Sequence, residues 1–226
     1  MSMVINSGRF KSVGPEPLVF TGSVGKIGSP GTSLTYTNVP IGTATANRWI
    51  VVGIYTNFNA GRTLSTVTIG GVSATLMYAA PTLSASGARL EFWKANVPTG
   101  TTANVVATSS GSMYDGACGA WSSQKEPMFY TGAIDTSISS GVFSLSIDIP
   151  DGGAVIAMSD HGGGGGTILA TSGVTQDFIN VSGSLRIWGG SEDMLSVETG
   201  RSIGVTWNTP APTANFYGLG AMSVSF

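Results

Sequence analysis

A pair of alternating runs around two glycines most constrains how this chain can fold. Residues 66–69 (Thr-Val-Thr-Ile) lead into Gly70-Gly71, and residues 72–76 (Val-Ser-Ala-Thr-Leu) follow. Glycine tolerates the positive φ angles of a two-residue hairpin turn, so this pattern predicts two antiparallel strands. Residues 89–95 and 102–108 are strand-like runs as well, with a proline and a glycine between them. The stretch therefore predicts strands closed by tight turns, with further sheet added on either side.

Similar runs recur along the rest of the chain at intervals of about 8–12 residues. The cleanest is 142–149, in which Phe, Leu and Ile alternate with Ser and Asp, as expected for a strand with one buried face. Residues 49–55 are apolar on both faces and predict a central strand. No stretch shows a convincing helical period with caps. We therefore predict an all-β fold, an antiparallel β-sandwich or jelly-roll-like domain with about a dozen strands.

The chain shows one composition throughout, and no linker divides it. Residues 1–16 are predicted to form an N-terminal arm, because Pro15 and Pro17 stiffen its end. A frayed terminus is the alternative interpretation. Residues 17–226 are predicted to form a single β-sandwich domain. The first residues lack the basic start and apolar core of a signal peptide, and no apolar run is long enough for a membrane helix, so we expect synthesis in the cytoplasm.

Charged residues are unusually rare in this chain. They make up 10% of it, where roughly a quarter is ordinary for a globular domain. The 10 basic residues are scattered singly, which disfavours a nucleic-acid-binding surface because such a surface needs basic side chains gathered on one face. A chain with so few charges cannot keep its surface well solvated. We therefore expect part of the surface to be covered by other protein.

No catalytic, cofactor or metal motif is present, so the sequence predicts no enzyme. His161 is the only histidine, and we interpret it as a loop residue before the glycine run 162–166. That run lacks the Lys-Ser/Thr of a phosphate-binding loop. Cys118 lies in an apolar run and is interpreted as a buried residue. Calcium binding through Asp148, Asp151 and Asp160 is an alternative, but aspartates are common in turns, and that interpretation is preferred.

A few side chains are candidate contacts with a ligand or a partner. Trp188 precedes two glycines at an expected strand end, where an exposed aromatic ring can meet a ligand or a neighbouring subunit. The complete set of candidate contact residues is Trp93, Trp188, Tyr114, Asp160 and His161.

Two segments of the chain are similar to a known class of proteins. They are residues 67–74 (Val-Thr-Ile-Gly-Gly-Val-Ser-Ala) and residues 90–106 (from Leu-Glu-Phe-Trp-Lys-Ala-Asn-Val-Pro to Val-Val). They resemble small β-rich structural proteins of tailed bacteriophages and prophages, found among capsid decoration, head-fibre and tail components. The resemblance implies a virion structural role without catalysis, with no functional residues to carry over. It implies location in the virion, after synthesis in the host cytoplasm.

The expected partners are copies of the chain itself and other virion proteins, either the major capsid protein or tail proteins. Decoration of the capsid surface is the preferred version, and a tail, collar or fibre position is the closest alternative. A lectin-like jelly-roll module that binds host-surface glycan is the main rival. It predicts exposed tryptophan or tyrosine beside Asp or Asn at one end of the sandwich. Neither nucleic acid nor membrane is expected as a partner.

Overall fold

The computed structural model describes residues 17–58, 62–81, 87–136, 141–162, 166–182, 185–208 and 217–226, without the side chains of residues 27–29, 194 and 217. The predicted arm, residues 1–16, lies outside the described residues. The part of the chain that is described contains fifteen β-strands and no helix. No described segment is thus a helix long and apolar enough to cross a membrane.

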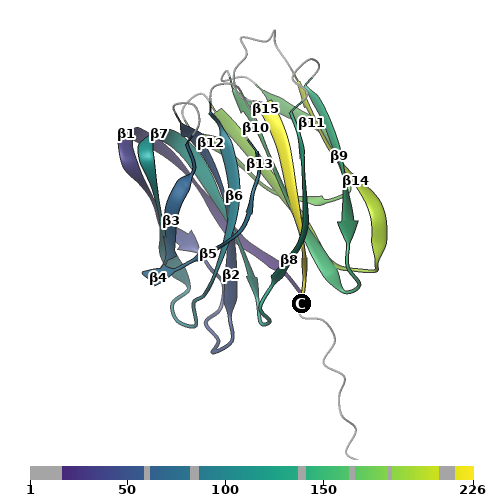
Figure 1. Ribbon diagram of the computed structural model, residues 1–226, viewed down its shortest axis with the longest axis horizontal. Helices are drawn as coiled ribbons and strands as arrows, with labels where there is room; N and C mark the ends of the chain where they lie inside the picture. The colour runs from purple at the N-terminus through teal and green to yellow at the C-terminus, as the bar shows by residue number, and fades with distance from the viewer. Residues whose placement is uncertain are drawn as a thin grey trace, which may run out of the picture.

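The strands fall into three antiparallel sheets. The strands are β1 (Val19–Pro40), β2 (Trp49–Phe58), β3 (Leu64–Ile69), β4 (Val72–Ser73), β5 (Thr75–Ala79), β6 (Arg89–Asn96), β7 (Thr102–Ser123), β8 (Met128–Asp135), β9 (Val142–Ile149), β10 (Gly153–Gly162), β11 (Thr167–Ser172), β12 (Thr175–Ser182), β13 (Leu185–Leu195), β14 (Glu198–Asn208) and β15 (Tyr217–Ser225). Figure 1 shows the sheets as successive layers across the molecule.

The first sheet curls back on itself. Its order is β4-β3-β7-β2-β6-β5, and β1 runs along the length of β7. Only Ala74 separates β4 from β5; β4 pairs with β3, and β5 pairs with β6. The path from β3 through β4 and β5 to β6 therefore nearly closes the sheet into a barrel. Its interior is filled by one apolar core, which includes Ile54, Val67, Trp93 and Cys118.

The second and third sheets pack beside the first. The second has the order β12-β13-β10-β15-β8, and the third has the order β11-β14-β9. One core, with Tyr55, Phe92, Met158 and Phe178, combines residues of the first and second sheets. Another core, with Trp188 and further residues of the second and third sheets, lies on the opposite face of the second sheet. Every residue of β10, the middle strand, is therefore buried.

The all-β antiparallel class predicted from the sequence is confirmed. Gly70 and Gly71 have φ angles of 61° and 83° in the turn between β3 and β4, as the two-glycine pattern requires. The alternating run 142–149 forms β9, with every second residue buried. The apolar run 49–55 lies in β2, which pairs with β6 on one side and β7 on the other. The jelly-roll-like sandwich stays a prediction.

A buried arginine ties together the loops at one end of the first sheet. Arg48 is 0% exposed, and its guanidinium donates three hydrogen bonds to backbone carbonyl oxygens. Nε donates to Val97 (2.8 Å), Nη1 to Gly42 (2.7 Å) and Nη2 to Thr99 (2.8 Å). Buried polar groups are costly unless they are paired, and each of these donors has a partner. Arg48 therefore has a structural role, which the sequence did not indicate.

Candidate functional site

The two tryptophans predicted as contact residues are buried. Trp93 points into the barrel-like sheet, where its Nε1 donates a hydrogen bond to Glu91 Oε2 (3.1 Å). Trp188 was expected at a strand end, and this is wrong, because it lies inside β13 and is fully buried between the second and third sheets. The two glycines that follow it are part of the same strand. Neither ring therefore offers an exposed face on which a ligand could stack.

Asp160 and His161 lie in a strand and not in a loop, which corrects the interpretation from the sequence. Both belong to the end of β10, and both are buried. Successive residues of a strand point to opposite faces. Asp160 faces the first sheet, where its Oδ2 accepts a hydrogen bond from the Tyr55 hydroxyl (2.8 Å). His161 packs against Trp207 of β14, with ring centroids 5.4 Å apart, so the two side chains do not form a pair.

A small polar cluster surrounds Asp160 where the first and second sheets meet. Burial raises the pKa of Asp160 to about 7, against the opposing effect of the Tyr55 hydrogen bond, and the nearby Asp115 carboxyl raises it further. Burial also raises the pKa of Asp115 to about 6, opposed by a hydrogen bond with Asn57. Both carboxyl groups therefore take up protons more readily than exposed aspartates do. The cluster joins two sheets through a hydrogen bond between β10 and β2.

The described residues contain no group of three or more His, Cys, Asp or Glu side chains arranged to hold a metal. Burial also lowers the pKa of His161, which favours its neutral form. Cys118 is buried among apolar side chains, and burial raises the pKa of its thiol, so little of the nucleophilic thiolate forms. Tyr114, on β7, is the one predicted contact residue that is half-buried rather than buried.

The most distinctive surface feature is apolar and lies on β5 and β8. We call it the β5–β8 strip and define it as Tyr78, Met128, Phe129 and Tyr130. Tyr78 is half-buried, and the other three side chains are between 44% and 52% exposed. The rings of Tyr78 and Phe129 stack with centroids 5.7 Å apart, which joins the two strands side by side. β5 ends the hydrogen-bonded order of the first sheet, and β8 ends that of the second.

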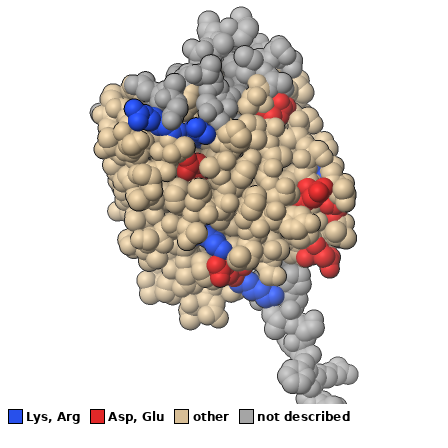
Figure 2. All heavy atoms as spheres, in the orientation of Figure 1, with Lys and Arg blue, Asp and Glu red and all other residues tan. Residues whose placement is uncertain are grey.

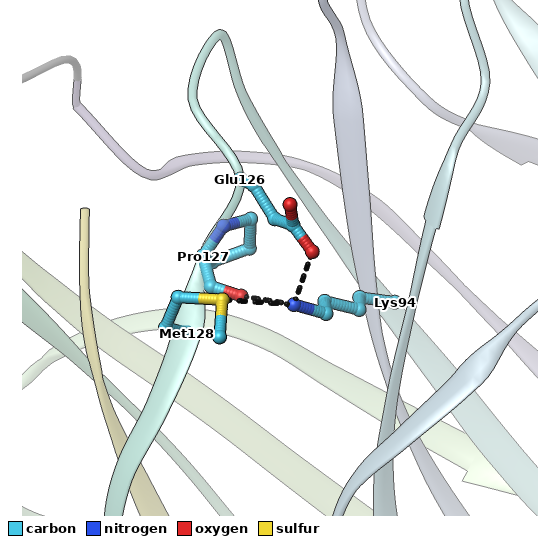
Figure 3. A network of polar contacts seen from close by, with 4 residues as sticks. All are labelled: Lys94, Glu126, Pro127 and Met128. Carbon is cyan, nitrogen blue, oxygen red and sulfur yellow. Dashed lines mark hydrogen bonds and ion pairs between the residues drawn. The ribbon is translucent and has the colours of Figure 1, made fainter.

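A lysine of the first sheet holds the start of β8 in place. Lys94 of β6 donates from Nζ to Glu126 Oε1 (2.7 Å), to the Pro127 carbonyl oxygen (2.9 Å) and to Met128 Sδ (3.4 Å) (Figure 3). Its ammonium group also lies 5.4 Å from the centre of the Trp49 ring. Lys94 is mostly buried, whereas about half of the Glu126 side chain is exposed (47%). The strip therefore begins at a fixed turn with one exposed carboxylate.

Charges are sparse on the molecular surface. Figure 2 shows one face on which lysine, arginine, aspartate and glutamate form a few separated groups within a broad uncharged surface. Adjacent exposed apolar side chains on such a surface are a feature of interaction sites. Three consecutive large apolar side chains, Met128 to Tyr130, break the alternation expected of a strand with one wet face. That break was the sequence signal for the strip, and the sequence analysis missed it.

No protein-family model matches this chain, and no curated protein or solved structure matches it either.

Proposed function

We propose that this protein is a non-enzymatic structural component of a tailed-phage particle, which decorates or stabilises the capsid surface. The observation that carries the proposal is the β5–β8 strip on a surface with few charges. A rigid all-β body with an open apolar strip suits repeated contacts with other subunits. The resemblance that suggests a virion role rests on residues 67–74 and 90–106, which contribute β3, β4, β6 and β7 of the barrel-like sheet.

The chemistry of the described side chains supports a binding or assembly role over catalysis. Asp160 and His161 point to opposite faces of the second sheet, and Cys118 is enclosed in the core of the first. An acid or base needs to reach a substrate, and a nucleophile needs a base beside it. These three side chains are all buried, Asp160 and His161 on opposite faces of the second sheet and Cys118 inside the first, so they do not form such a group.

A tail, collar or fibre component is the alternative position in the particle, because the same strip would serve any protein neighbour. The lectin-like jelly-roll module is the second candidate function, and one observation favours it. Phe129 and Tyr130 expose aromatic rings on β8, and such rings are able to stack on sugars. The tryptophans argue against it, because four are buried and Trp49 is half-buried beneath Lys94.

The proposal is tested on phage particles purified from cells whose genome or prophage carries this gene. Peptide mass spectrometry of density-banded particles is expected to find the protein at a fixed ratio to the major capsid protein. Labelling with an antibody under the electron microscope then distinguishes head from tail. Absence of the protein from intact particles would overturn the virion role. Glycan-array binding that is lost in Tyr130→Ala would favour the sugar-binding module instead.

A further inference from the structure

We propose that residues 1–16 of one copy dock on the β5–β8 strip of a neighbouring copy. The inference rests on the proposed assembly role and names the partner of the strip. Its first support is the place where the segment joins the described part of the chain. Val19 pairs with Ser122 near the end of β7, and a short turn leads from β7 to β8. Figure 1 shows that β1 starts beside the C-terminal end of the chain, and Ser225 at that end pairs with Met128 of the strip.

The length and sequence of the segment fit an exchange between copies. Sixteen residues would span at most about 50 Å if fully extended, which is enough to cross from one subunit to the next. Gly14 and Glu16 each precede a proline, which disfavours helical backbone at that position.

The segment and the strip are also chemically matched. The segment carries apolar side chains that need cover, at Met1, Met3, Val4, Ile5, Phe10 and Val13. Its basic residues Arg9 and Lys11 outnumber its single acidic residue, Glu16. Beside the strip, the Glu126 side chain is 47% exposed, and its carboxylate pairs with Lys94. Burial of the apolar side chains would therefore supply most of the stability of the contact.

β8 itself favours a docked segment over direct pairing of two β8 strands. Its pairing with β15 shifts register between Phe129 and Thr131, so Tyr130 is an extra, bulged residue at the end of the exposed part of β8. Bulges at sheet edges terminate regular pairing. A flexible chain segment adapts to such an edge through side-chain contacts, whereas a second rigid sheet would need an unbroken ladder.

The test is cross-linking in the full-length protein with a photoreactive phenylalanine analogue in place of Phe129. A mixture of isotopically light and heavy chains separates contacts between copies from contacts within one chain. The matched control carries the analogue at Leu169, which is 65% exposed on β11 of the third sheet. We expect the analogue at position 129 to form cross-links with residues 1–16 of a chain that carries the other isotope label. The yield of these cross-links should be at least ten times that from the analogue at position 169.

Each other outcome overturns the inference. Cross-links to residues 1–16 of the same chain would show that the segment covers its own strip. Cross-links to β5 or β8 of another copy would show that two strips pair directly. Equal yields at positions 129 and 169, or no cross-link to any chain, would show that the segment does not dock there. Because the experiment uses purified protein, its result is independent of whether the protein is found in phage particles.

Discussion

The carboxyl group of Asp160 couples protonation to the contact between two sheets. It is fully buried, and its pKa is raised to about 7 chiefly by that burial. In the unfolded chain the same group titrates at an ordinary value near 4. The folded protein therefore holds this proton over a pH range in which the unfolded chain has lost it. Between those two pKa values, the contribution of Asp160 to the free energy of unfolding falls as pH rises.

We expect Asp160→Asn to flatten the pH dependence of stability between pH 4 and 7. The amide keeps an acceptor for the Tyr55 hydroxyl but does not ionise, so the variant avoids a cost that reaches about 4 kcal/mol at pH 7.5 as an upper bound. Urea unfolding at pH 4.5 and 7.5 measures the change. Asp151→Asn, in the exposed turn before β10, is the matched control. An equal change in unfolding free energy for wild type and Asp160→Asn would contradict this prediction.

Arg48 is the residue whose replacement is expected to damage the fold most. Its three hydrogen bonds hold the carbonyl groups of Gly42, Val97 and Thr99. Lysine keeps the charge but cannot reproduce the planar fork of donors, which leaves buried carbonyl groups unpaired. We expect Arg48→Lys to lower the free energy of unfolding by about 3 kcal/mol. Arg62→Lys, at an exposed position, should change it by less than about 0.5 kcal/mol, and equal effects would refute the structural role.

At the scale of the elements, two sheets approach closely because glycines make room for one ring. Phe178 of β12 packs on Gly119 of β7 and Gly189 of β13. A Cβ atom added at Gly119 would lie 2.5 Å from the Phe178 ring and 2.8 Å from the Trp121 ring. Such overlap forces the rings or the backbone to shift. The glycine content of this chain therefore serves packing between sheets as well as turns.

Gly119→Ala is expected to destabilise the protein by about 1–3 kcal/mol, because the extra methyl group overpacks the core between the first two sheets. Phe178→Leu makes room for that methyl group at the cost of ring contacts. The double variant should therefore be more stable than the sum of the two single effects predicts. Thermal unfolding of the four proteins in this cycle measures the coupling. Strict additivity would mean that Phe178 does not limit the space at Gly119.

The exposed end of β8 is expected to affect association and leave folding intact. Tyr130→Lys places a charge in the β5–β8 strip, and charged residues at sheet edges oppose contacts with other chains. We expect the melting temperature of the variant to stay within about 3 °C of the wild-type value. At the same protein concentration, its average molar mass in solution should be lower than that of wild type. Val197→Lys is the control, because Val197 is 68% exposed outside the strip. If both variants associate as wild type does, the strip is not an interface.

Elements with one buried face were predictable from sequence, and those buried on both faces were less so. β9 alternates because one of its faces is exposed, and the β3–β4 turn is set by its own two glycines. β10 has no wet face, so its sequence carries no period, and its end at His161 and Gly162 was mistaken for part of the glycine loop. The pairing of β5 with β6 and the stacking of Tyr78 on Phe129 join distant segments, which local patterns do not reveal.

At the scale of the whole molecule, three cores contain the buried apolar side chains of the described residues, and the β5–β8 strip lies outside them. The second sheet contributes to two of these cores, so the layers support one another through β10. The chain has few charged residues that would oppose contact with other protein molecules. An exposed apolar strip and a surface with few charges are expected of a protein that binds other subunits. These two features are the basis of the proposed structural role.

The mass of the full-length protein in solution, measured by light scattering over a range of concentrations, tests this role most directly. A self-associating structural protein should give a discrete multiple of the 23.0 kDa chain mass, and Tyr130→Lys should shift it toward that of a single chain. A mass of 23.0 kDa at every concentration, for wild type and variant alike, would contradict self-association through the β5–β8 strip.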